Sequence, residues 1–284
     1  MPVDILAVSA RALGFVALFQ AGGIVLFLAL HRHELARTAP ALRRLGMLAA
    51  VLAAVLLTAE YLLQAARMSG ELAGALDPTL LGLLLHSGAS VTFSWQLLGL
   101  VLVILALRSR RAEDSLLGVT GVVILLAAFT FVGHTAGSPQ RWLLSLLLLV
   151  HLSVVTFWFG ALPPLHVISS GETSEDAARI VADFSARAVW LVPGLFLAGL
   201  LLAVALLPNV AALRSAYGEL LMAKVVGFCA LLVLAASNRW RFGPALRSGG
   251  PAAGRRFRQA LAAEYLIIVG VVCVTAVMTT FYSP

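Results

Sequence analysis

Charged residues are scarce in this chain. Asp, Glu, Lys and Arg make up 12% of its 284 residues, about half the share found in soluble domains, whereas hydrophobic residues make up 61%. This composition excludes a soluble globular enzyme, a disordered chain and a disulfide-rich secreted domain. The apolar runs are about 20 residues long, which favours membrane-spanning helices over the shorter, alternating strands of a membrane barrel. The sequence therefore predicts an all-α, polytopic membrane protein.

Lysine and cysteine are almost absent. Lys224 is the only lysine among 20 basic residues, and Cys229 and Cys273 are the only cysteines. The net charge of +7 could suggest a nucleic-acid partner, but most arginines lie between apolar runs, where membrane topology explains them. We therefore predict no nucleic-acid partner. Both cysteines lie inside apolar runs, so no disulfide framework is expected, and no basic start suggests a cleavable signal peptide.

Several catalytic motifs are missing. The sequence has no Walker A motif, no CxxC or CPx motif of a copper-pumping ATPase, and no HExxH or GxSxG motif. These absences argue against an ATPase, a zinc protease and a serine hydrolase. We predict that the protein is not an enzyme.

Eight apolar runs predict a single transmembrane domain over residues 1–284, since each run can cross a hydrocarbon core of about 30 Å. Three prolines inside the fifth and sixth runs, Pro163, Pro164 and Pro193, predict kinks there. The predicted spans are 9–30, 43–67, 79–107, 115–134, 141–168, 186–207, 217–240 and 260–281.

The distribution of basic residues predicts the orientation. Eight spans place both termini on one side, and the segments after the odd-numbered spans hold 15 of the 20 basic residues. The segments after the even-numbered spans hold only Arg67, Arg141 and Arg214. Because cytoplasmic loops are enriched in Lys and Arg, the odd-numbered loops should be cytoplasmic and both termini periplasmic.

Two short segments hint at an internal repeat. Phe19-Gln20-Ala21-Gly22 in the first span parallels Phe157-Trp158-Phe159-Gly160 in the fifth, 138 residues further on. A 4+4 parallel repeat would produce this offset, although a chance match between apolar helices would also explain it.

Polar residues inside the spans are the candidates for function, because a buried ionisable group in a membrane is costly unless paired, solvated or metal-bound. Three histidines, His86, His134 and His151, fall in one outer layer, and Met278 also lies in the outer half. Imidazole suits copper, zinc and iron, and a thioether favours Cu(I). The alternative for each histidine is a hydrogen bond to a neighbouring helix.

Charged residues inside the spans have two interpretations. Glu60 and Lys224 lie at similar depth with opposite charge, so they could form a structural ion pair or tune a transport site. Glu264 is expected near the inner end of the last span. Trp158 lies about two turns below His151 and could line a path for an ion.

The motifs of the second half resemble the CopD/PcoD family of bacterial inner-membrane copper resistance proteins. The similarity is strongest over residues 130–282 and weaker over 1–130. It rests on Gly133-His134-Thr135-Ala136, the stretch His151 to Pro163 around Trp158, Phe184-Ser185, the stretch Tyr217-Gly218 to Lys224, Asn238-Arg239 and Glu264. The resemblance implies copper handling at the periplasmic side, copper passage across the inner membrane, and often a periplasmic copper-binding partner.

These observations predict a membrane protein that moves copper ions and contributes to copper homeostasis and resistance. The predicted metal ligands are His86, His134, His151 and Met278, with copper as the bound ion and membrane lipid around the spans. The alternative is a redox protein with b-type haem or copper, in which His86 and His151 could be axial ligands. A third class is a membrane scaffold for the assembly of a copper enzyme.

Overall fold

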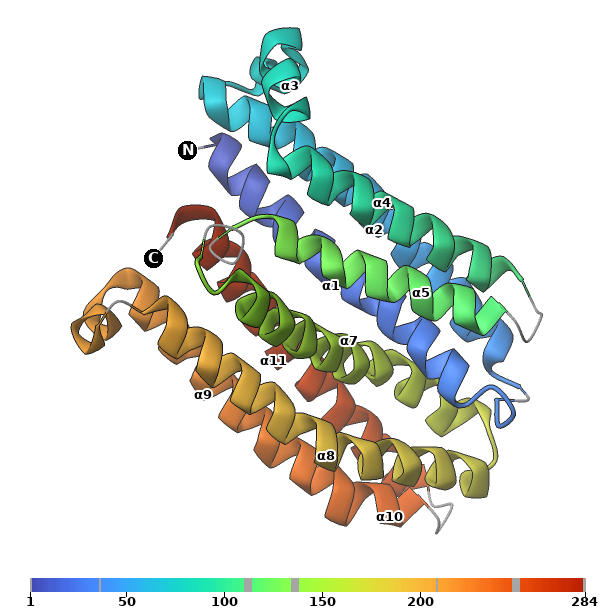
Figure 1. Ribbon diagram of the computed structural model, residues 1–284. Helices are drawn as coiled ribbons and strands as arrows, with labels where there is room; N and C mark the ends of the chain where they lie inside the picture. The colour runs from blue at the N-terminus through green and yellow to red at the C-terminus, as the bar shows by residue number, and fades with distance from the viewer. Residues whose placement is uncertain are drawn as a thin grey trace.

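A computed structural model describes residues 2–35, 37–109, 114–133, 138–207, 209–246 and 251–282, which form helices and no strand (Figure 1). The all-α prediction is confirmed. In chain order the elements are α1 (Pro2–Leu30), α2 (Ala39–Ser69), η1 (Leu72–Leu76), α3 (Pro78–Leu85), α4 (Gly88–Arg108), α5 (Asp114–Ala127), η2 (Ala128–Phe131), α7 (Arg141–Gly171), α8 (Ser174–Leu206), η3 (Val210–Arg214), α9 (Ala216–Ser237), η4 (Asn238–Phe242), α10 (Gly243–Ala245) and α11 (Pro251–Phe281).

Eight helices in the described part of the chain are long and apolar enough to cross a membrane, as predicted. Several of these helices extend beyond the apolar runs: α8 begins at Ser174, twelve residues before the predicted span, because Thr173 caps it by accepting from the Asp176 N–H. Pro163, Pro164 and Pro193 lie within α7 and α8, which continue through them.

The predicted span 79–107 is not one helix. It is split into α3 and α4, and the membrane-spanning part is Gly88–Arg108. The Ser87 hydroxyl accepts from the Ala89 N–H and thereby starts α4 anew. Five leucines among residues 80–85 continue the apolar run into α3, but α3 lies apart from the main bundle at one end (Figure 1).

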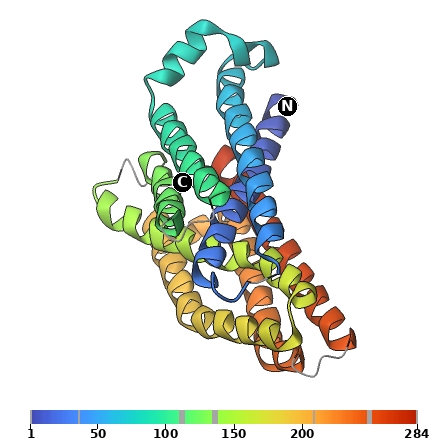
Figure 2. The ribbon, with the colours of Figure 1, turned by 90° about the vertical axis from the view of Figure 1, so that its right-hand side faces the viewer.

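The helices pack in pairs within each half of the chain. In the first half α1 packs on α2 and α4 on α5; in the second half α7 packs on α8 and α9 on α11 (Figures 1 and 2). The first helices of the two halves, α1 and α7, pack on each other, and α11 packs on both. This arrangement agrees with a 4+4 parallel repeat, and the repeat itself stays a prediction.

Glycines bring α1 and α7 into backbone contact. A Cβ atom on Gly23 would lie 2.3 Å from the Cα of Gly160 and 2.3 Å from the carbonyl oxygen of Thr156. No side-chain rotation could relieve such an overlap, because both neighbours are backbone atoms. Small residues allow helices in membranes to approach closely and gain van der Waals contact. This glycine crossing, Gly23 on Gly160, joins the two halves of the protein.

Two arginines fasten one end of the bundle, which carries both termini and is called the terminal face below. Arg11 of α1 forms an ion pair with Glu60 of α2, with its Nε atom 2.7 Å from Oε1, and donates to the carbonyl oxygen of Thr279. Arg67 of α2 pairs with Asp4 and donates to the carbonyl oxygen of Thr280. The start of α1 and the end of α11 therefore lie together (Figure 1).

Candidate functional site

His151 lies in α7 with its imidazole against the backbone of α8. A Cβ atom on Gly199 would lie 3.2 Å from Cε1 and 3.3 Å from Nδ1 of His151, so the glycine leaves room for the ring. Nδ1 is shielded from solvent and makes no hydrogen bond of normal geometry to a described residue, but the backbone of Leu195 in α8 acts on the imidazole as a hydrogen-bond partner. The alternative role, a hydrogen bond to a neighbouring helix, therefore agrees with this position. A neutral imidazole has two ring nitrogens, so one can bond the backbone while the other accepts a ligand.

Lys224 of α9 belongs to the surroundings of His151, on which its charge acts. Glu60, the partner considered for Lys224, instead forms an ion pair with Arg11. The expectation of a direct Glu60–Lys224 pair is wrong, since similar depth in the membrane does not make two helices neighbours. Of the two roles considered for Lys224, tuning of a polar site agrees with its position.

Of the other predicted ligands, Met278 and His86 lie at other levels of the bundle than His151. Met278 is buried near the end of α11 at the terminal face, whereas His86 is exposed between α3 and α4, before the membrane-spanning segment begins. The expected position of His86 within a span is therefore wrong. His134 falls in 134–137, outside the described residues. Within the described ranges, no three His, Cys, Asp or Glu side chains form a group that could hold a metal ion.

A carboxyl group deep in the bundle is held by two neutral donors. Glu264 of α11 is 2% exposed, and its Oε2 atom accepts from the Trp158 Nε1–H at 3.3 Å. Its Oε1 atom accepts from the side-chain amide of Asn238, the first residue of the π-turn η4. We call Trp158, Asn238 and Glu264 the Glu264 cluster. Because α11 begins at Pro251 rather than at 260, Glu264 lies farther from the helix end than expected.

Gln20 of α1 forms a hydrogen bond to a backbone carbonyl of α7 that has no partner within its own helix. Its Nε2 atom donates to the carbonyl oxygen of Phe159 over 3.1 Å. In an unbroken helix this carbonyl would accept from the N–H four residues later, but that residue is Pro163, which has no N–H. The sequence carried this signal, since a proline in a span identifies the carbonyl that needs a donor. The Oε1 atom of Gln20 is buried without a partner among the described residues.

A second buried histidine lies at the opposite end of the bundle from the terminal face. His31 follows α1 and is 2% exposed, and its ring packs against Phe27 in a tilted arrangement with centroids 4.7 Å apart. Its Nδ1 atom lies 3.7 Å from a carboxylate oxygen of Asp183 and 3.8 Å from one of Glu34. Burial lowers the pKa of His31 below its usual 6.5, although the two carboxylates oppose this effect.

The lowered pKa of His31 predicts a pH-dependent stability. The unfolded chain binds a proton near pH 6.5 and the folded chain only at lower pH, so the contribution of neutral His31 is complete above pH 6.5 and declines below it. Thermal unfolding in detergent between pH 5 and 8 should show a steeper loss of Tm below pH 6.5 in the parent protein than in a His31→Gln variant. Equal slopes would contradict the prediction; His33→Gln, at an exposed neighbour, is the control.

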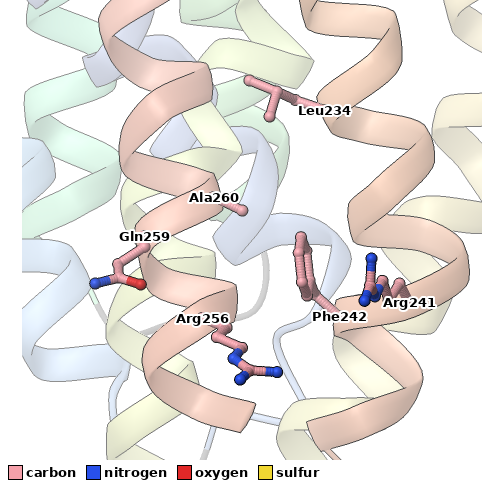
Figure 3. Close-up of a pocket in the computed structure, with 6 residues that line it drawn as sticks. All are labelled: Leu234, Arg241, Phe242, Arg256, Gln259 and Ala260. Atoms are coloured by element: carbon pink, nitrogen blue, oxygen red, sulfur yellow. The ribbon is translucent and has the colours of Figure 1, made fainter. Parts of the chain in front are cut away.

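An open groove of about 540 Å³ lies between the end of α9, the π-turn and α11 (Figure 3). Two arginines, Arg241 and Arg256, line it together with Leu234, Phe242, Gln259 and Ala260. Neither arginine forms an ion pair with a described residue. Two positive charges and no acidic lining residue make this groove unsuitable for a copper cation.

In the described part of the chain, eight helices long and apolar enough to cross a membrane, with a buried imidazole in α7 and a buried carboxyl group in α11, define a polytopic helical membrane protein with polar side chains inside its spans. Ionisable groups inside membrane helices are rare, because their burial is costly.

The chain belongs to the copper resistance protein D (CopD) family. The family described as "Copper resistance protein D" matches residues 178–278, and "Copper resistance protein D-like, N-terminal domain" matches residues 1–139. The predicted family is thus confirmed, and the N-terminal match extends the relationship across the half in which the motifs are weaker. No curated protein sequence and no solved structure matches the chain. The protein is a multi-pass membrane protein of copper resistance.

Proposed function

We propose that this protein binds copper at its periplasmic face and moves it across the inner membrane. The observation that carries the proposal is the position of His151, whose imidazole is buried in a span beside the Leu195 backbone and makes no hydrogen bond of normal geometry at Nδ1, in a chain of a copper resistance family. Neutral imidazole is a common ligand of copper. Residues 1–284 would act as one transmembrane unit, since α1 packs on α7 and α11 on both.

The remaining ligands are proposed from the sequence. His134 follows η2 in the chain and precedes α7, so it would be an entry ligand, with His151 deeper in the membrane. Met278 is buried near the terminal face and would supply a thioether, which favours Cu(I). His86 is exposed in the α3–α4 junction, where it would meet copper or a periplasmic copper-binding protein first. No side chain in this proposal is a catalyst, and the protein would not be an enzyme.

Copper titration of purified protein tests the ligand set. His151→Ala and His134→Ala should each weaken copper binding, because each removes one imidazole from a site with few ligands. His33→Ala is the matched control, since its imidazole is exposed at the opposite end of the bundle and should leave binding unchanged. Unchanged stoichiometry and affinity in folded His134→Ala and His151→Ala protein would rule out the proposed site.

A visible spectrum of the same sample separates copper transport from the redox alternative. A colourless preparation with stoichiometric copper is expected. A Soret band that disappears in His151→Ala would instead favour a b-type haem protein.

The periplasmic position of both termini is tested by cysteine labelling in spheroplasts. Cys229 and Cys273 are first replaced by serine, and single cysteines are placed at the exposed positions Ala211 and His33. An impermeant maleimide should label Ala211→Cys in intact spheroplasts and His33→Cys only after lysis. The reverse pattern would invert the orientation inferred from the arginine distribution.

A further inference from the structure

The Glu264 cluster places an acid inside the bundle with no cation to balance it. No Lys, Arg or His among the described residues forms an ion pair with Glu264, whose two oxygens meet only Trp158 and Asn238. A buried carboxylate without a counter-charge is costly, and a buried acid lowers that cost by taking up a proton. The cluster therefore differs from the Arg11–Glu60 pair, where the counter-charge is present.

The position of the cluster is far from both ends of its helices. Glu264 lies about 20 Å along the axis from the start of α11 and about 26 Å from its end. Trp158 lies about 26 Å from the start of α7 and about 20 Å from its end, so the two residues agree in depth. Trp158 is also about 10 Å along the axis of α7 from His151. The carboxyl group therefore lies beyond His151 on the way into the membrane.

The polar and charged side chains next to the cluster make their contacts elsewhere. Tyr265, the next residue of α11, packs against Phe159 of α7 with the rings tilted and their centroids 5.0 Å apart. Arg239, next to Asn238 in η4, donates to the carbonyl oxygen and hydroxyl of Ser185 in α8. From α1, Gln20 contributes a neutral amide to Phe159. Neutral groups alone therefore surround the carboxyl group in the described contacts.

Asn238 can serve both charge states of Glu264. Its amide nitrogen donates to Oε1, while its own Oδ1 atom is buried without a partner among the described residues. The two ends of an amide have nearly the same shape, so a half-turn of the side chain exchanges donor for acceptor. An ionised Glu264 accepts from the NH2 group, and a protonated Glu264 donates its O–H to Oδ1. Trp158, which can only donate, remains bonded to the second carboxyl oxygen in both states.

We propose that Glu264 is a proton-binding site that loses its proton when copper enters the bundle and regains it when copper leaves. The carboxylate and H⁺ combine to a neutral acid in the absence of the metal. When Cu⁺ arrives, the O–H bond breaks, H⁺ leaves, and the metal's positive charge compensates the carboxylate. The positive charge of Cu⁺ replaces the positive charge of H⁺, and the oxidation state of copper does not change. This inference rests on the proposed copper transport and names the ion that is coupled to it.

Infrared difference spectroscopy tests the proton site without requiring transport. The protein in lipid should show the C=O band of a buried carboxylic acid, shifted in D₂O, that disappears on addition of Cu(I). Glu264→Gln keeps the size and an acceptor oxygen and should lack the band, whereas Glu219→Gln, at an exposed carboxyl group of α9, should keep it. Absence of a Glu264-dependent band, or a band insensitive to copper that binds stoichiometrically, would overturn the proposal.

The second test measures proton movement across the membrane of proteoliposomes that contain a pH-sensitive dye. Copper addition should cause proton movement with parent protein and Glu219→Gln, and none with Glu264→Gln that still binds copper. Copper-linked proton movement that persists in Glu264→Gln would overturn the coupling role. If the parent protein takes up no copper, the transport function fails while the infrared band still decides the proton site.

Asn238→Leu is the second variant. Without the amide, the protein should retain the infrared band of the Glu264 acid over a shifted pH range, and an unchanged pH range would contradict the role given to Asn238.

Discussion

A Gly23→Ala variant is expected to lose most of its folded population. The added Cβ atom would lie 2.3 Å from backbone atoms of both Gly160 and Thr156, so α1 and α7 must separate. Overpacking of a core by single methyl groups usually costs about 1–3 kcal/mol, and a clash with backbone should reach or exceed the top of this range. The measurements are the Tm in detergent and the monodisperse fraction on size-exclusion chromatography.

Gly270→Ala is the matched control for this experiment. Gly270 lies in α11, and nothing lies within 4 Å of a Cβ atom placed on it. Its replacement should change stability by no more than about 1 kcal/mol, the range of the intrinsic helix preference of alanine over glycine. A Gly23→Ala protein as stable as Gly270→Ala would show that α1 and α7 do not touch at these glycines.

Loss of the Arg11–Glu60 pair should produce the second large effect. The side chains are 16% and 13% exposed, so removal of one partner leaves a largely buried charge. For fully buried pairs this costs about 3–5 kcal/mol, and partial exposure should reduce the cost to about 1–3 kcal/mol for Glu60→Gln. Arg11→Met should cost at least as much, because it also removes the bonds to Thr279 and Thr280.

A double-mutant cycle identifies the partner of Glu60. Arg11→Met and Glu60→Gln should be non-additive, whereas Lys224→Met and Glu60→Gln should be additive. The exposed pair Arg179–Asp176 is the control, and its loss should change stability by less than about 1 kcal/mol. Additivity between Arg11 and Glu60 would mean that the ion pair contributes nothing to stability.

The spans were predictable because crossing a membrane imposes a length and an apolar composition that a sequence displays directly. All eight predicted runs correspond to membrane-spanning helices, although the third was drawn too long. The error at 79–107 has a local cause: the leucines of α3 continue the apolar run, while Ser87, a single capping residue, ends it. Hydropathy averages over such a residue, whereas the hydrogen bond to Ala89 decides where the helix begins.

The polar contacts were less predictable because depth along one helix does not determine which helices are neighbours or how they rotate. Glu60 and Lys224 agreed in depth, yet Arg11 on the adjacent helix is the partner of Glu60. Glu264 was identified as an intramembrane acid. Its hydrogen-bond donor Asn238 was not predicted, because Asn238 lies in a π-turn that no residue pattern indicated. Gln20 could have been assigned, since Pro163 leaves the Phe159 carbonyl free at a known spacing.

The glycine crossing has a mechanical consequence. Two helices that touch backbone to backbone at one point resist sliding, because neighbouring side chains would collide, but they can still swivel about that point. Gly160 lies about 28 Å from the Arg141 end of α7 and about 16 Å from the Gly171 end, so it divides the helix into unequal lever arms. A tilt of about 10° would displace the longer arm by about 5 Å and the shorter by about 3 Å in opposite directions, as in rigid-body rocking of one bundle against another. Such a rotation would turn about a point two residues along α7 from Trp158, and the bonds from Arg11 and Arg67 to the end of α11 would have to break for the terminal face to take part in it.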